Sequence, residues 1–139
     1  MSDDYLVGLF DGEGCITIGY TKKDRVYLKC SVEMSSPEAV EAFQARFGGY
    51  IYKRKLRGAN QQTWQWTLSS MKCLPLLELV SSKGLVKRKI ASLCLPVARS
   101  YIKKHMQTDV PSDVKDMRIE TMRQVRALNG ARNRFATVT

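Results

Sequence analysis

The segment Tyr-Leu-Val-Gly-Leu-Phe-Asp-Gly-Glu-Gly at residues 5–14 limits the possible folds more than any other part of the chain. Its first half is apolar, and Gly8 and Gly12 are four residues apart, so they share one face of a helix. Small residues at this spacing let a second backbone approach closely. The segment closes with Asp11 and Glu13, each followed by glycine. We therefore expect a helix that packs by one face and presents carboxylates at its C-terminal end.

Two pairs of segments after this helix alternate between apolar and polar residues, which is typical of strands in a half-buried sheet. Residues 15–21 and 26–34 flank a short polar turn and predict one β-hairpin. Residues 50–56 and 63–68 flank a connection with turn composition and predict a second hairpin. Each predicted hairpin has one apolar face and one polar, partly basic face.

The rest of the chain carries apolar residues at helical spacing. Ser36-Pro37 predicts a helix start, with Ser36 as the N-cap, and Gly48 predicts its end. The later helices are expected over residues 71–80, from Val86 onward with a kink at Pro96, and over 114–128 with an end at Asn129-Gly130. The element order indicates an α+β fold with a four-stranded antiparallel sheet backed by helices. We expect a single domain over 1–139, with 131–139 as a basic tail.

Composition narrows the function classes. The net charge of +10 and the sequence pI of about 9.7 favour a polyanionic partner, with nucleic acid ahead of a membrane surface. The chain contains no apolar run long enough to cross a membrane, and no charged-then-apolar leader opens it, so we expect an intracellular protein that is not secreted. The compartment stays open between a bacterial cytoplasm and an organelle matrix.

The four cysteines are widely spaced and include no Cys-x-x-Cys pair, which fits reduced and mostly buried thiols. His105 is the only histidine, which argues against a zinc site.

Residues 6–14 resemble the LAGLIDADG motif of homing endonucleases. Every position is identical or conservative, with Val7 in place of Ala, Phe10 of Ile, Gly12 of Ala and Glu13 of Asp. The alternative is a surface helix that ends by coincidence in Asp-Gly-Glu-Gly. The resemblance also covers the αββαββα order and, weakly, residues 125–129. The motif occurs once, and in this family single-motif chains act as homodimers.

The resemblance implies a metal-dependent double-strand cut in a long, near-palindromic DNA site. Glu13 would then be the catalytic acid that binds Mg²⁺, or another divalent cation such as Mn²⁺, with the Gly12 carbonyl as a further ligand, while Asp11 would be structural. The dimer interface would comprise Leu6, Gly8, Leu9 and Gly12. Lys87 corresponds to the catalytic lysine of the family, with Lys89 as the fallback, although a solvated basic helix start explains Lys87 as well. Ser36 corresponds to a third catalytic position, but its role as an N-cap is the simpler reading.

The polar sheet face is the expected DNA-binding surface, because a two-stranded ribbon fits the major groove and Arg, Lys, Thr, Ser and Gln contact phosphates or base edges. The alternative is a face that is merely solvated. The predicted DNA-binding residues are Cys15, Thr17, Gly19, Thr21, Lys22, Arg25, Tyr27, Lys29, Ser31, Glu33, Tyr52, Arg54, Thr63, Gln65 and Thr67.

Other functions remain open at this point. Some members of the family bind intron RNA as splicing cofactors (maturases), and a non-cleaving DNA-binding regulator could use the same fold. The presence of Glu13 and Lys87 favours cleavage over both.

Overall fold

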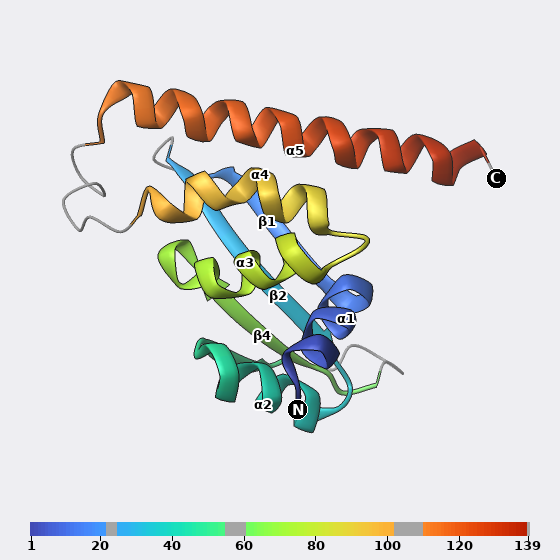
Figure 1. The fold of residues 1–139 in the computed structure, drawn as a ribbon. Helices are drawn as coiled ribbons and strands as arrows, with labels where there is room; N and C mark the ends of the chain where they lie inside the picture. Colours follow the sequence, from blue (N-terminus) through green and yellow to red (C-terminus); the bar gives the residue numbers. More distant parts are fainter. Residues whose placement is uncertain (22–24, 55–60, 102–109, 139) are drawn as a thin grey trace.

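The computed structural model describes residues 1–21, 25–54, 61–101 and 110–138, with side chains as far as residue 130. Helices cover one face of a four-stranded antiparallel sheet, as the α+β prediction required (Figure 1). The elements in chain order are α1 (Asp3–Glu13), β1 (Gly14–Tyr20), β2 (Val26–Met34), α2 (Pro37–Phe47), β3 (Tyr50–Lys53), β4 (Trp64–Ser69), the 3₁₀ turn η1 (Ser70–Cys73), α3 (Leu74–Lys83), α4 (Arg88–Arg99) and α5 (Ser112–Val138).

Helix α1 ends with Glu13, so its acidic residues lie at the C-terminal end as predicted. The Ser2 hydroxyl accepts a hydrogen bond from the Tyr5 amide at 3.2 Å and so caps the N-terminus. Phe10 is fully buried, and its ring packs so closely on Gly14 that a Cβ at this glycine would overlap it. The chain therefore passes from helix directly into β1, which places the acidic end of α1 at the edge of the sheet.

The sheet has the strand order β1-β2-β4-β3. Strand β2 matches its predicted bounds, while β1 and β4 are each shifted by one residue. Strand β3 was expected to reach residue 56 but ends at Lys53, and residues 55–60 lie outside the described part of the chain. The apolar residues Ile16, Ile18, Leu28, Cys30, Val32, Trp66 and Leu68 are buried on one face as predicted. The alternation breaks at the end of β1, where Gly19 is buried and Tyr20 is exposed.

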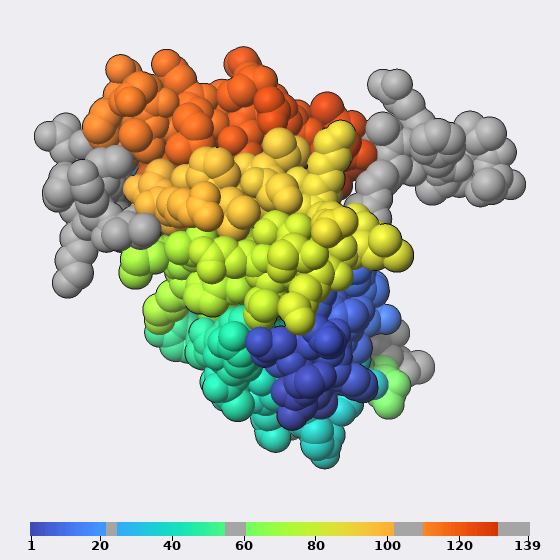
Figure 2. All heavy atoms as spheres, in the orientation of Figure 1, coloured from blue at the N-terminus to red at the C-terminus, as the bar shows by residue number. Residues whose placement is uncertain are grey.

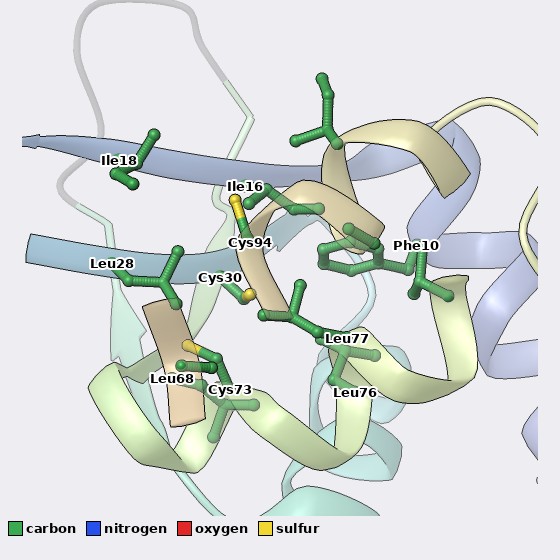
Figure 3. Close-up of a cluster of buried hydrophobic side chains, with 14 of the residues drawn as sticks. Phe10, Ile16, Ile18, Leu28, Cys30, Leu68, Cys73, Leu76, Leu77 and Cys94 are labelled. Carbon is green, nitrogen blue, oxygen red and sulfur yellow. The ribbon is translucent and has the colours of Figure 1, made fainter. Parts of the chain in front are cut away.

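The core lies between the apolar face of the sheet and the helices. Phe43 of α2 stacks on Trp66 of β4 with ring centroids 4.8 Å apart, and the Trp66 indole donates to the Gly48 carbonyl at 2.8 Å. Cys30, Cys73 and Cys94 are buried free thiols in the same core (Figure 3), while Cys15 is an exposed free thiol. This agrees with the expectation of reduced, mostly buried cysteines.

The C-terminal helices differ from their predicted bounds. The predicted helix over 71–80 is divided into η1 and α3, and Pro96 lies inside α4, which continues to Arg99. The expected end at Asn129-Gly130 is wrong, because α5 remains helical through Val138. One interior glycine costs a helix only about 1 kcal/mol, so the flanking residues can carry the helix past it. Residues 131–138, which were expected to form a basic tail beyond the last helix, therefore continue α5.

A buried arginine fastens α5 to the rest of the fold. Arg118 is 5% exposed, its Nε donates to the Ser100 hydroxyl at 2.9 Å, and its guanidinium lies 4.1 Å from the centre of the Tyr101 ring. The Tyr101 hydroxyl in turn donates to the Val26 carbonyl of β2. None of the described helices is long and apolar enough to span a membrane.

Candidate functional site

The acidic end of α1 lies at the surface. Glu13 and Gly12 are exposed, and a Cβ added at Gly12 would have open space around it. The carbonyls of the last helical turn have no partners within a helix, and the helix dipole makes this end electronegative. The Glu13 carboxylate adds a full negative charge at the same place, so this end of α1 is suited to attract a cation.

Asp11 joins α1 to the start of α4. Its carboxylate accepts backbone hydrogen bonds from Leu85 at 2.6 Å, Val86 at 3.1 Å and Lys87 at 3.0 Å. Partial burial by itself would raise the pKa of Asp11, but the hydrogen bonds from these amides and the positive charge of Lys87 outweigh it and lower the pKa. These contacts support the structural role that the resemblance gives to Asp11.

Lys87 meets α1 through its side chain as well. The Lys87 Nζ donates to the Asp11 carbonyl at 2.5 Å, within the last turn of the helix that ends at Glu13. Lys89, the fallback, is exposed on α4. The structure thus brings Lys87 and the acidic end of α1 together from positions 76 residues apart.

A cavity of about 210 Å³ opens beside Lys87. It is lined by Gly14, Cys15, Ile16, Lys87, Ile90 and Asn129. Asn129 comes from α5 and was not predicted as a site residue; the weak family resemblance of residues 125–129 was the signal that pointed to it. The amide side chain of Asn129 therefore lines the same cavity as Lys87.

The Ser36 hydroxyl forms its hydrogen bond within the start of α2. The side chain makes no capping bond to the helix backbone, and the hydroxyl donates to Glu38 Oε2 at 3.0 Å. The cap position itself is as predicted, while the described contacts of the Ser36 hydroxyl link it to α2 and not to Glu13 or Lys87.

The polar face of the sheet gathers most of the predicted DNA-binding residues. Cross-strand pairing sets them in rows, with Cys15, Ser31, Thr67 and Tyr50 in one row and Thr17, Lys29 and Ser69 in the next. A third row contains Glu33, Gln65 and Tyr52. Tyr50 and Ser69 belong to this face but were missed, although the same alternation identifies them.

Exposure differs across this polar face. Ser31 and Thr67 are each 8% exposed and form its floor, while Tyr52 and Arg54 stand out from it. Gly19, which was expected to approach DNA closely, is buried beneath the Tyr27 ring of the neighbouring strand, so the Tyr27 side chain covers it in this structure.

The turn of the first hairpin is only partly described. Thr21 and Arg25 are exposed there, and the Thr21 amide donates to the Arg25 carbonyl at 2.7 Å. The predicted contact residue Lys22 lies outside the described residues.

A hollow of about 650 Å³ lies over the β2, β3 and β4 part of the polar face. Its lining residues are Lys29, Tyr52, Lys53, Arg54, Gln65, Thr67 and Ser69. Cationic, hydroxyl and amide side chains line this hollow together, and these are the groups that contact phosphates and base edges in nucleic acids.

The outer face of α1 is open. Gly8 is exposed and a Cβ added there would meet no atom within 4 Å, while Leu9 is half-buried. Leu6 is a correction to the predicted interface, because it is 1% exposed and packs inside the core. Leu85 and Val86, which Asp11 holds beside α1, are 85% and 52% exposed and add apolar surface that the sequence analysis missed. Figure 2 shows α1 (dark blue) at the surface beside α2 and α3.

Comparison with solved structures identifies the fold. The fold matches I-CvuI bound to its target in the presence of Ca, with a TM-score of 0.70 and 19% identity over 91% of this chain and 80% of the other. It also matches the archaeal intron-encoded homing endonuclease I-Vdi141I complexed with DNA, with a TM-score of 0.61 and 15% identity over 87% and 82%. The meganuclease I-AabMI bound to uncleaved DNA matches with a TM-score of 0.65 and 20% identity, over 88% of this chain but 44% of the other.

Comparison at the level of sequence identifies the family. No curated protein matches the sequence significantly. The family model for the LAGLIDADG endonuclease matches residues 6–94, which begin in α1 and end within α4 and so include both Glu13 and Lys87. The match covers more than half of the chain and agrees with the fold of the solved structures. The chain therefore belongs to the LAGLIDADG endonuclease family.

Proposed function

We propose that this protein is a site-specific DNA endonuclease that acts as a homodimer and cuts both strands with the help of a divalent cation. The observation that carries the proposal is the contact of Lys87 with the last turn of α1, beside Glu13 and next to a cationic sheet face. This contact supports the proposal because the Glu13 carboxylate would bind a cation and the Lys87 ammonium would neutralise a phosphate beside the polar face of the sheet.

The oxygen donors at the end of α1 would fit a hard cation if two protomers and a DNA phosphate contributed to one site. The described residues of one chain contain no group of three His, Cys, Asp or Glu side chains that could hold a metal ion. Magnesium is commonly held by one or two carboxylates together with phosphate oxygens and water. Glu13 and the Gly12 carbonyl of one protomer, the same groups of a second protomer and a DNA phosphate would make such a set. The proposal therefore couples cation binding to dimer formation and to bound DNA.

The open face of α1 supports the dimer. Gly8 and Gly12 leave the helix backbone accessible, and Leu85 and Val86 extend this face with apolar side chains. A two-fold axis along the two α1 helices would bring both Glu13 carboxylates together, and it would make the two sheet faces read a near-palindromic site.

Each part of the protein has a separate task in this reaction. The polar sheet face would bind and orient the duplex, and the Lys87 ammonium would stabilise negative charge that develops on the phosphate. A bound divalent cation would supply Lewis-acid stabilisation and an activated water. Asp11 would hold the Lys87 backbone in place without touching the DNA.

A cleavage-site selection tests the proposal. Purified protein is incubated with a randomised duplex library and Mg²⁺ or Mn²⁺, and the cut ends are sequenced. We expect discrete double-strand cuts at a long, near-palindromic site. Glu13→Gln should abolish cutting and retain binding, while Glu41→Gln on the exposed surface of α2 should cut like the wild type.

The remaining outcomes would contradict the proposal in distinguishable ways. Tight, sequence-specific DNA binding without cutting, in any of several divalent cations, would indicate a regulator. Binding to structured intron RNA with little binding to DNA would indicate a splicing cofactor.

A further inference from the structure

Glu33, Arg54 and Thr63 form a connected group at one end of the polar face. Arg54 Nε lies 3.3 Å from Glu33 Oε1, and the Thr63 hydroxyl donates to Glu33 Oε2 at 3.1 Å. Both charged side chains are solvent-exposed, at 55% for Arg54 and 43% for Glu33. Strand β2, the residue after β3 and the residue before β4 thus contribute to one surface group, in which both Glu33 carboxylate oxygens have a partner.

The backbone beneath Arg54 is also fixed. Its amide donates to the Thr63 carbonyl at 3.0 Å, and the Gln62 side-chain amide donates to the Arg54 carbonyl at 2.6 Å. The Arg54 backbone is therefore held in place at the end of β3, and the Glu33 carboxylate orients the Arg54 side chain. An ion pair this exposed contributes little to stability, so a stabilising role explains the arrangement poorly.

The negative charge of Glu33 is unfavourable on a surface that is proposed to bind DNA. Among the described residues of the polar face, Glu33 is the only acid, and the side chains around the adjoining hollow include Lys29, Lys53 and Arg54. A carboxylate here repels phosphates and lowers non-specific affinity. Such a cost is reasonable if the acid improves discrimination between sequences.

We propose that Arg54 reads a guanine in the major groove and that Glu33, anchored by Thr63, is the positioning residue that aims it. The guanidinium carries five donors in a planar fork. With Nε directed to Glu33, the terminal Nη groups remain for the O6 and N7 acceptors of guanine, the commonest specific contact of arginine. The inference rests on the proposed function, because it assumes that this face binds duplex DNA; in a homodimer it specifies one guanine in each half-site.

Affinity selection tests this inference. The wild-type protein and its variants are each used to enrich a randomised duplex library without cleavage, in Ca²⁺, and the base preference is compared position by position. Arg54→Ala should remove a guanine preference of roughly 5- to 150-fold at one position per half-site. Arg99→Ala, an exposed arginine on α4 on the helical side, should leave the profile unchanged.

The Glu33 variant distinguishes positioning from simple charge. Glu33→Ala should weaken the guanine preference at the same position as Arg54→Ala while raising the affinity for random duplex. Thr63→Val should weaken the same preference less. Glu41→Ala also removes one negative charge, but from α2, which packs against the apolar side of the sheet, so it should leave the base preference unchanged.

Each other outcome overturns a defined part. An unchanged profile in Arg54→Ala overturns the guanine assignment. The positioning role is overturned if Glu33→Ala binds all sequences more tightly and keeps the guanine preference. It is also overturned if Glu33→Ala loses a preference for cytosine at a different position, because Glu33 would then itself contact a base. A wild-type protein that enriches no duplex overturns the proposed function itself, whereas a wild-type site with unaffected variants overturns only this inference.

Discussion

The junction between α1 and α4 and the polar face of the sheet are held in different ways. At the junction, one carboxylate, that of Asp11, accepts from three successive backbone amides, and Lys87 donates back to the Asp11 carbonyl. On the polar face, the pair of Arg54 and Glu33 joins two exposed side chains to each other and involves no backbone group. Hydrogen bonds to the backbone hold the junction, whereas contacts between side chains shape the polar face.

Under the proposed function, this difference separates the residues for cleavage from those for DNA recognition. A group that acts on the phosphate must be held closely in place, so the backbone hydrogen bonds between Asp11 and residues 85–87 suit the role proposed for Lys87. Side chains on a fixed sheet can be exchanged without disturbing the fold, because the apolar residues on the opposite face carry the packing. We therefore expect changes at the junction to impair activity or folding, and changes on the face to alter affinity or sequence preference.

The largest expected effect comes from removing the Lys87 ammonium. Lys87→Ala should reduce single-turnover cleavage by about 10²- to 10³-fold, the usual cost of losing one group that stabilises transition-state charge. DNA affinity should change little. Lys89→Ala provides the matched control, because Lys89 is an exposed lysine two residues along the same segment. If Lys89→Ala lost the activity instead, the assignment of Lys87 would be wrong.

Asp11 should matter most for stability. Asp11→Ala leaves the amides of residues 85–87 without their acceptor and should lower the free energy of unfolding by about 2 to 3 kcal/mol, measured in urea. Asp4→Ala removes an exposed ion pair with Lys83 and should cost less than about 1 kcal/mol. Equal losses in the two variants would show that the junction is no more firmly fixed than the surface.

The pH dependence of the same interaction has a defined sign. The pKa of Asp11 is lowered from its ordinary value of 3.8, so the folded state favours the ionised carboxylate. Its stabilisation is present above about pH 3.8 and is lost as the pH falls through the lower folded value. The stability difference between wild type and Asp11→Asn should therefore be constant near neutral pH and shrink in acid. A difference that grew on acidification would contradict this assignment.

The outer face of α1 allows the dimer to be tested apart from the fold. Gly8→Ala adds a methyl group that meets nothing in the protomer, so the protomer should gain up to about 1 kcal/mol of helix stability. The same methyl should hinder close approach of a second α1 and weaken the dimer about tenfold, measured by sedimentation equilibrium. Gly130→Ala in α5 is the matched control, since its added Cβ is equally unobstructed. A dimer unaffected by Gly8→Ala would place the interface elsewhere.

Sequence patterns predicted the sheet well because alternation is a local property. One residue's exposure predicts that of its neighbour two positions along, so the β2 bounds and the two faces followed directly. The burial of Gly19 did not follow, since it depends on a tyrosine from the paired strand. The resemblance placed Leu6 in the dimer interface, but Leu6 is buried in the core, and the apolar run of α1 does not by itself distinguish the core-facing side from the open side.

The residues at the junction of α1 and α4 were singled out only through resemblance. No local pattern links Asp11 to the amides of Leu85 and Val86, which are more than 70 residues away. Asn129 was missed as a cavity residue because it was assigned to a helix end, whereas α5 continues past Gly130. Long-range hydrogen bonds and helix docking are thus what the sequence alone left open.

The smallest expected effect is on the polar face itself. Lys29 lies between Thr17 and Ser69 in the middle of the sheet, and Lys29→Ala should weaken DNA binding a few-fold with no loss of stability. If the Lys29 ammonium neutralises one phosphate, the slope of log affinity against log salt should become shallower by about 0.9 in the variant. Lys115→Ala, on the exposed surface of α5, should leave the slope unchanged. An unchanged slope with an altered base preference would assign Lys29 to base reading, and a collapse of folding would show that the face is as tightly constrained as the junction.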